Sequence, residues 1–199
     1  MHPIYLIRHG ETELNANRTL QPAGTPLSER GIAQALRLGE RMRPARIARI
    51  LASDLARAAM TAEAVHAATG APLEFDAALH ERNFGELRGR TYESLGFDPF
   101  AEGYAPPGGE SWEVFHERVA RAWRNVLATA ARTDGPLAVV THGLVCRGVI
   151  SFHAPPAPGV APPTLFRNTS VSVLEAAPWR ATLVDCCVHL EDARETGAA

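Results

Sequence analysis

The segment Ile4-Tyr5-Leu6-Ile7-Arg8-His9-Gly10 begins as a short apolar, β-prone run and stops at two basic residues and a glycine. A run of this kind is typical of a buried strand that ends in a loop. A second apolar run, Pro136–Thr141, stops at His142-Gly143 in the same way. In open α/β sheets, ligands bind beyond the carboxyl ends of the strands. If the two strands are neighbours, both imidazoles face one pocket.

The remaining periodicity alternates between strands and amphipathic helices. The other strands are expected at Ile47–Ala52 and Pro72–Phe75, with a closing hairpin of Ser170–Leu174 and Ala181–Val188 that turns at Pro178. Helices are expected from a Ser28 cap to Pro44, from a Ser53 or Asp54 cap to about Gly70, from Ser111-Trp112 through Leu127, and around Val145, Val149 and Ile150. This alternation predicts a single domain over residues 1–199, folded as a three-layer α/β/α sandwich with a mostly parallel sheet.

Two segments do not fit this regular pattern. Thr12–Leu27 is loop-rich, and Leu79–Ser111 is rich in glycine, proline and aromatic residues without a clear long element. A structureless stretch of about 30 residues inside a compact domain favours a functional loop. We therefore expect a lid or insertion at about residues 82–111. Trp112, Phe115 and Trp123 stand at helical spacing and are expected in the core.

Composition sets limits on the partners and the compartment. The net charge of −2 gives no bulk attraction to nucleic acid or to an acidic membrane, so any anion site must be a local cluster of cations. No apolar stretch approaches a membrane span, and the N-terminus lacks the pattern of a signal peptide. The three cysteines, at 146, 186 and 187, are unpaired in number and lack zinc-type spacing. We expect a soluble cytoplasmic protein, and a homodimer is left open.

Several motifs together resemble the histidine phosphatase superfamily, the phosphoglycerate mutase-like group. The matching stretches are Leu6-Ile7-Arg8-His9-Gly10-Glu11-Thr12-Glu13-Leu14-Asn15, Pro26-Leu27-Ser28-Glu29-Arg30-Gly31, Ala52-Ser53-Asp54-Leu55-Ala56-Arg57-Ala58, Leu79-His80-Glu81, Gly108-Gly109-Glu110-Ser111, Val139-Val140-Thr141-His142-Gly143 and Asn168-Thr169-Ser170. They stand in the family's order and span about residues 4–175. The resemblance implies the phosphoglycerate mutase-like fold and phosphoryl-transfer chemistry.

The resemblance also implies roles for individual residues. His9 corresponds to the histidine that is transiently phosphorylated, and Glu81 to the usual proton donor. Arg8, Arg57 and His142 correspond to the cationic cradle of the phosphoryl group. Asn15, Gln21 and the backbone N–H of Gly143 match positions that help to hold phosphate oxygens. The chain departs from the family's pattern near Gln21, where Pro22 and Gly24 replace the usual glycine and aspartate.

The chemistry of these residue types agrees with the resemblance. Phosphoryl transfer needs mainly positioning and neutralisation of charge, which several basic side chains supply without a metal. Cationic neighbours should lower the pKa of His9 and keep its imidazole neutral and nucleophilic. Glu81 can protonate the leaving group and then take a proton from the attacking water. A metal site of His9, Glu81 and His142 is disfavoured by the two arginines, so we expect no metal and no cofactor.

The reaction is predicted to be hydrolysis of a small phosphomonoester. Mutases of this family are longer and carry an Arg-Arg insertion that this interval lacks, which favours a phosphatase. The aromatic residues of the lid suggest a nucleoside, ribazole or sugar monophosphate, but they can equally pack against each other. A phosphoglycerate mutase or sugar bisphosphatase is the alternative enzyme. A non-catalytic phosphate-binding regulatory domain is a third hypothesis, which the retention of Glu81 disfavours. His80 is expected to be a loop residue or to support the site indirectly.

Overall fold

A computed structural model describes residues 1–176 and 178–191. Its sheet has six strands in the order β3-β2-β4-β1-β5-β6. The strands are β1 (Ile4–Arg8), β2 (Arg49–Ala52), β3 (Leu73–Phe75), β4 (Leu137–Thr141), β5 (Val171–Glu175) and β6 (Arg180–Cys186). The first four are parallel to one another, whereas β5 and β6 form an antiparallel pair at one edge. The mostly parallel sheet and the closing hairpin were both predicted.

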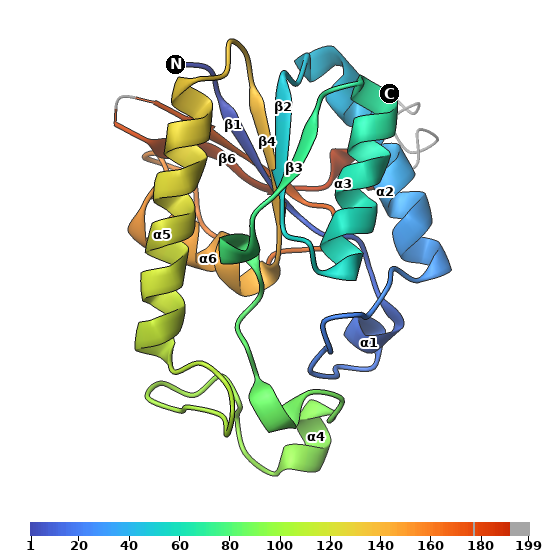
Figure 1. The fold of residues 1–199 in the computed structure, drawn as a ribbon, viewed down its shortest axis with the longest axis vertical. Helices are drawn as coiled ribbons and strands as arrows, with labels where there is room; N and C mark the ends of the chain where they lie inside the picture. Colours follow the sequence, from blue (N-terminus) through green and yellow to red (C-terminus); the bar gives the residue numbers. More distant parts are fainter. Residues whose placement is uncertain (177, 192–199) are drawn as a thin grey trace.

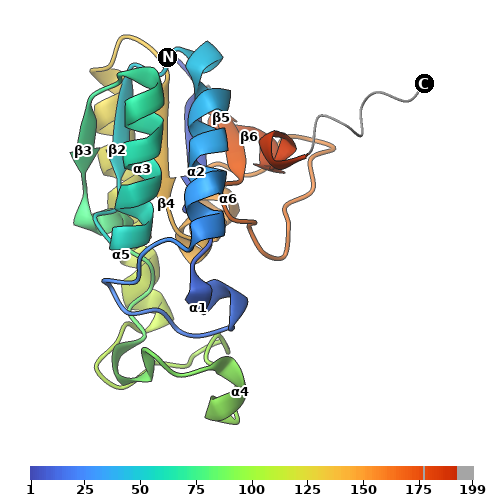
Figure 2. The same cartoon turned by 90° about the vertical axis from the view of Figure 1, so that its right-hand side faces the viewer.

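Two pairs of helices cover the two faces of this sheet (Figures 1 and 2). Helices α2 (Glu29–Met42) and α3 (Ala56–Thr69) lie on one face, and α5 (Trp112–Ala131) and α6 (Gly143–Phe152) lie on the other. Successive side chains of each strand point to opposite faces of the sheet. In β1, Leu6 therefore packs in the core under α5 and α6, and Ile7 packs in the core under α2 and α3. The predicted three-layer sandwich is confirmed.

Two of the predicted helix caps are present in the structure, and one is not. Ser28 and Ser111 cap α2 and α5, each accepting a backbone N–H from three residues onward. The expected Ser53 or Asp54 cap of α3 is wrong, because that helix begins at Ala56 after Leu55 and has no side-chain cap. The Ser53 hydroxyl instead lies 2.8 Å from Nε2 of His142. It also accepts the N–H of Leu55 at 3.3 Å, so it serves the loop before α3 and the contact with His142, and it does not cap the helix.

The two irregular segments hold only short elements. A single turn, α1 (Glu13–Ala16), interrupts the first of them and is closed by a capping box between Thr12 and Asn15. The second contains short 3₁₀ turns at Ala77–Leu79 and Gly85–Leu87 and the short helix α4 (Tyr92–Leu95). It projects beyond the carboxyl ends of the parallel strands (Figure 1). We call residues 82–111 the lid.

Aromatic contacts give the lid a small apolar cluster of its own. Phe84 and Phe100 meet edge to face with ring centroids 5.4 Å apart, and Tyr92 and Phe100 do so at 5.2 Å. Leu20 and Leu87 are buried in the same cluster. The aromatic residues of the lid therefore pack against one another, which is one of the two roles that the sequence left open for them.

The aromatic residues of α5 were predicted to be core. Phe115 and Trp123 are buried, and Trp112 is partly buried against the same cluster. The guanidinium of Arg82 lies over the Trp112 ring at 4.0 Å, which ties the start of the lid to the start of α5.

Candidate active site

Two histidines meet at the carboxyl edge of the sheet because their strands are neighbours. Strands β1 and β4 pair in parallel, with Arg8 opposite Thr141 at their ends. His9 and His142 follow directly, and their ring centroids lie 5.1 Å apart. Both side chains are buried. The condition set by the sequence, that the two strands be adjacent, is met.

The ring of His9 is held in one orientation by its own loop. Nδ1 of His9 lies 2.7 Å from the carbonyl oxygen of Gly10. Because a carbonyl oxygen only accepts, the proton is on Nδ1 and Nε2 keeps its lone pair. The N–H of Gly10 in turn donates to the hydroxyl of Thr61, at 3.0 Å. The backbone here runs so close to α2 that a Cβ on Gly31 would overlap the carbonyl oxygen of Glu11.

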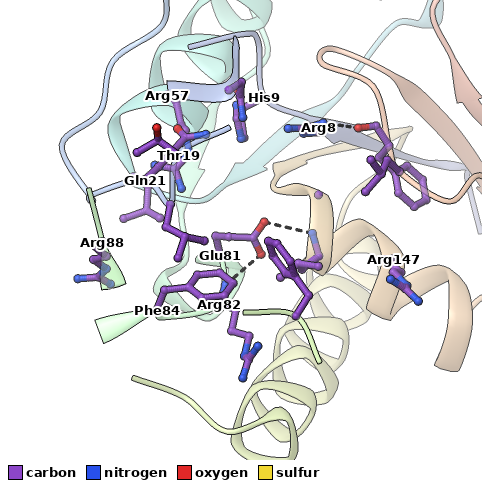
Figure 3. A pocket seen from close by; sticks show the side chains of 18 of the residues that line it. Arg8, His9, Thr19, Gln21, Arg57, Glu81, Arg82, Phe84, Arg88 and Arg147 are labelled. Carbon is purple, nitrogen blue, oxygen red and sulfur yellow. Dashed lines mark hydrogen bonds between the residues drawn. The ribbon is translucent and has the colours of Figure 1, made fainter. Parts of the chain in front are cut away.

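Two arginines approach His9 from either side (Figure 3). Arg8 ends β1 and donates to the carbonyl of Phe166. Arg57 lies in the first turn of α3 and donates to the carbonyl of Pro22 at 3.2 Å. Among the described residues, the Nε atoms of both arginines are buried without a hydrogen-bond partner. Burial lowers the pKa of Arg57 to about 10, so it remains a cation at neutral pH.

The electrostatic environment keeps His9 neutral. Burial lowers the pKa of His9 well below its ordinary value, and the charges of Arg57 and Arg8 lower it further. The sequence predicted the effect of the arginines, and the structure adds burial as the larger cause. A neutral imidazole with a free Nε2 is therefore available for nucleophilic attack.

Glu81 lies across the pocket from these groups, just after the 3₁₀ turn at Ala77–Leu79. Its two carboxyl oxygens accept backbone N–H groups, Oε1 from Arg82 at 3.0 Å and Oε2 from Leu144 at 3.1 Å. Burial raises the pKa of Glu81, while these N–H groups and the two arginines lower it in part. The net upward shift favours a carboxyl group that holds its proton for longer as the pH rises.

Arg118 of α5 fixes the backbone that carries Glu81. This residue was not among the predicted site residues. Its guanidinium donates to the carbonyls of Ala78, His80 and Glu81 at distances between 2.7 and 3.2 Å. Arg118 is itself paired with Glu110 at 2.7 Å. No local motif marks such a residue, because the carbonyls that it contacts lie 37 to 40 positions away.

The predicted site residues surround one pocket of about 140 Å³ (Figure 3). All of them except His142 line it, namely Arg8, His9, Asn15, Gln21, Arg57, Glu81 and Gly143. Phe84, Tyr92 and Phe100 of the lid form apolar parts of the wall, and Arg88 and Arg147 stand on opposite sides of the pocket. The pocket thus combines a cationic end with an aromatic wall.

His142 lies behind the wall of the pocket. Its Nε2 meets the Ser53 hydroxyl at 2.8 Å, and within the described residues its buried Nδ1 has no partner. Burial lowers its pKa well below the ordinary value, with Arg57 and His9 adding to the effect. A direct contact between His142 and a phosphoryl group stays a prediction.

The amide side chains near His9 form a short network. Asn168 donates from Nδ2 to the His9 carbonyl at 3.1 Å and to Oδ1 of Asn15 at 3.3 Å. The side-chain oxygen Oε1 of Gln21 accepts from the Thr12 hydroxyl at 3.1 Å. Gly143 is the first residue of α6. The sequence motif contained Asn168, but no role was predicted for it.

Other candidates stand apart from the pocket. Nε2 of His80 contacts the carboxylate of Asp54, away from the pocket lining, which places His80 as the sequence suggested. Across residues 1–176 and 178–191, no group of three or more His, Cys, Asp or Glu side chains could hold a metal ion. Over the same residues, none of the helices has the length and hydropathy needed to cross a membrane.

Comparison with known proteins identifies the family. The profile of the histidine phosphatase superfamily (branch 1) matches residues 4–188. The probable phosphoglycerate mutase GpmB of Salmonella choleraesuis (strain SC-B67) is 36% identical over 163 residues, which cover 76% of this chain and 74% of that protein.

Solved structures are similar over nearly the whole length. A mycobacterial glucosyl-3-phosphoglycerate phosphatase, solved in complex with VO3, is 25% identical with a TM-score of 0.78, covering 94% of this chain and 100% of that one. A phosphoglycerate mutase from Bacillus anthracis (strain Sterne) is also 25% identical, with a TM-score of 0.79 and 94% of each chain covered. Similarity of this degree does not separate the two activities. The chain belongs to the histidine phosphatase superfamily, branch 1.

Proposed function

We propose that this protein is a metal-independent phosphomonoesterase that acts through a phosphohistidine at His9 on a small phosphorylated metabolite. The observation that carries the proposal is the arrangement around His9. Its Nδ1–H donates to the Gly10 carbonyl, which leaves the lone pair on Nε2, and two arginines flank it opposite Glu81. A regulatory phosphate-binding domain has no use for the acid or for an oriented nucleophile.

In the first step, Nε2 of His9 attacks phosphorus and the ester P–O bond breaks. Glu81 gives its proton to the departing oxygen, and Arg8 and Arg57 neutralise the charge on the phosphoryl oxygens. In the second step, a water molecule attacks phosphorus and gives its proton to the Glu81 carboxylate. The P–N bond breaks, so inorganic phosphate leaves and both residues return to their starting states.

The scheme needs no metal because two arginines already supply positive charge at the phosphate. Arg57 is a buried cation and Arg8 a half-buried one at the phosphate end of the pocket, and a divalent ion there would add repulsion. They supply the positive charge that a metal would otherwise bring.

A phosphatase is favoured over a mutase by the composition of the lid. Apolar aromatic side chains, Phe84, Tyr92 and Phe100, occupy the wall beyond Glu81. The relative named as a probable phosphoglycerate mutase and the presence of Arg88 and Arg147 at the pocket support the mutase as the second candidate. Interconversion of 2- and 3-phosphoglycerate faster than phosphate release would establish that second function.

The test is hydrolysis of p-nitrophenyl phosphate together with a trap for the intermediate. Phosphate release should be unchanged by EDTA and abolished by His9→Ala, and rapid acid-free quenching of labelled substrate should give acid-labile label on the protein. His2→Ala is the matched control, since His2 is exposed and pairs with Asp134 at the surface, outside the pocket lining. No turnover of a panel of about a hundred phosphomonoesters would overturn the proposal.

A further inference from the structure

A second cavity of about 470 Å³ lies next to the catalytic pocket, between the lid and the helices α5 and α6. The two cavities share three lining residues, Phe100, Leu144 and Arg147. They are therefore neighbours across a narrow boundary. The role assigned to the catalytic pocket does not account for this second space.

The expected path of a leaving group points toward this boundary. In an in-line displacement the leaving oxygen lies on the far side of phosphorus from His9, next to the proton donor Glu81. Oε2 of Glu81 accepts the N–H of Leu144 at 3.1 Å, and the side chain of Leu144 lines both cavities. A leaving group that extends beyond its first few atoms must therefore pass Leu144.

The lining of the second cavity is rich in flat rings. Trp112, Phe115 and Phe152 surround His116, with ring centroids 5.6, 5.7 and 5.0 Å from that of His116. Phe152 is 63% exposed at the rim, although its ring already contacts His116. A large aromatic side chain left open to solvent beside a cavity offers a stacking surface for a ligand ring.

The lining also includes polar side chains, among them the carboxylates of Glu102 and Glu113. Arg147 of α6 stands between the two cavities, and Ser151 adds a hydroxyl one turn further along the same helix. Burial lowers the pKa of His116, which favours the uncharged form of its ring. The combination suits a ring with an apolar face and a polar edge more than a second phosphate.

We propose that this second cavity is a leaving-group subsite, which accepts the distal aromatic or heteroaromatic ring of a phosphomonoester whose phosphate lies at His9. The proposal rests on the phosphatase function proposed above and names its substrate class. A compact three-carbon leaving group such as glycerate stays within the catalytic pocket and gains nothing from the subsite.

Two substrates of matched chemistry test the subsite. Phenyl phosphate and biphenyl-4-yl phosphate both release a phenol, but only the second carries a ring that reaches past Leu144. Ser151→Trp should fill the cavity and Phe152→Ala should remove the stacking surface. We expect each variant to lower kcat/KM for the biphenylyl ester about tenfold, as for the lost burial of one aromatic face, with phenyl phosphate changed less than about twofold.

Two control variants separate the subsite from general effects on α5 and α6. Val114→Ala removes an exposed apolar side chain, and Glu117→Trp adds an exposed indole; both residues lie on α5 and line neither cavity. Neither should alter the preference between the two esters. Equal losses on both esters in Ser151→Trp, or no loss on either, would overturn the subsite.

Binding to His9→Ala, measured by calorimetry, keeps the subsite testable if wild-type protein hydrolyses neither ester. Tighter binding of biphenyl-4-yl phosphate than of phenyl phosphate, lost on adding Ser151→Trp, would support the subsite while the phosphatase proposal fails. Equal binding of the two esters would overturn the subsite whatever the catalytic result.

Discussion

Glu81 is the residue whose ionisation should set the pH dependence of turnover. Burial raises its pKa, so at a given pH it is protonated to a greater extent than an exposed carboxyl. As the pH rises through this raised pKa the donor loses its proton, and turnover of esters with poor leaving groups should fall. Glu81→Gln should remove that fall and lower kcat for glycerol 2-phosphate about 10²- to 10⁴-fold, the usual range for a general acid.

Activated aryl esters provide the internal comparison for this prediction. p-Nitrophenolate leaves without a proton, so Glu81→Gln should affect p-nitrophenyl phosphate less than glycerol 2-phosphate in the phosphorylation step. Glu86→Gln, an exposed carboxyl in the next 3₁₀ turn, is the matched control and should leave both pH profiles unchanged. Identical losses on the two esters would show that Glu81 has a role other than proton donation to the leaving group.

Asn168 should act by positioning the loop that carries the nucleophile. Its Nδ2 donates to the carbonyl of His9 and to Oδ1 of Asn15. Asn168→Asp keeps the shape of the side chain but loses both donors. We expect kcat to fall about tenfold or more, since one hydrogen bond contributes about 1 kcal/mol and small displacements of a nucleophile are costly.

Two measurements separate a role of Asn168 in positioning from a role in folding: kcat and the urea midpoint of unfolding. The urea midpoint of Asn168→Asp should stay close to that of wild type, and Asn17→Asp, at the exposed end of α1, should change neither quantity. A loss of kcat matched by an equal loss of folded protein would mean that Asn168 serves the fold alone.

At the scale of elements, the start of α2 is fitted against the nucleophile loop. A Cβ on Gly31 would overlap the backbone of Glu11, and a Cβ on Gly10 would lie 2.7 Å from the carbonyl oxygen of Gly31. Gly31→Ala must therefore push the loop after His9 away from α2. We expect a loss of about 1–3 kcal/mol in the free energy of unfolding, as for other overpacked sites, together with a fall in kcat.

Gly24→Ala is the matched control for this fit. A Cβ at Gly24 meets nothing within 4 Å, and its φ is not in the left-handed region. Denaturant unfolding and kcat should both stay near wild type for this variant. If Gly31→Ala behaves in the same way, the loop moves freely relative to α2 and the backbone contact does not position His9.

The elements predicted correctly are those that depend on residues close together in the sequence. Buried strands such as β1 and β4 show as short apolar runs, and Ser28 caps α2 through a neighbour three residues away. The start of α3 was misplaced because Ser53 resembles a cap, yet its hydroxyl contacts His142, which follows β4 and lies 89 residues away. The lid was predicted as irregular, but the hydrogen bonds that hold it together join Arg82 to carbonyls of Tyr104 and Glu110, 22 and 28 residues away, and leave no local pattern.

At the scale of the whole molecule, the site depends on the strand order. The order β2-β4-β1 brings together loops that lie more than a hundred residues apart in sequence. The motifs nominated Arg8, Arg57, Glu81 and His142 beside His9. The first three line one pocket with His9, whereas His142 does not line it, and the roles of all of them stay predictions. The burial of His142 behind the wall could not be predicted, because it depends on packing between β4, β2 and the His9 ring.

A pocket built from distant segments should couple phosphate binding to global stability. The buried Nε atoms of Arg8 and Arg57 have no partner among the described residues, and an anion between these arginines compensates their desolvated charge. Inorganic phosphate at 100 times its Kd should therefore raise the free energy of unfolding by about 2.7 kcal/mol. For a chain of this size that corresponds to a rise of roughly 5–10 °C in Tm.

The thermal shift can be assigned to the pocket by substitution at constant ionic strength, set with sodium chloride. Arg57→Met replaces the buried cation with an uncharged chain of similar length and should abolish the rise in Tm with phosphate. Arg121→Met changes an exposed arginine of α5 outside the pocket and should preserve it. An equal rise in both variants would point to a general salt effect, because a specific site requires the charge of Arg57 beside the nucleophile.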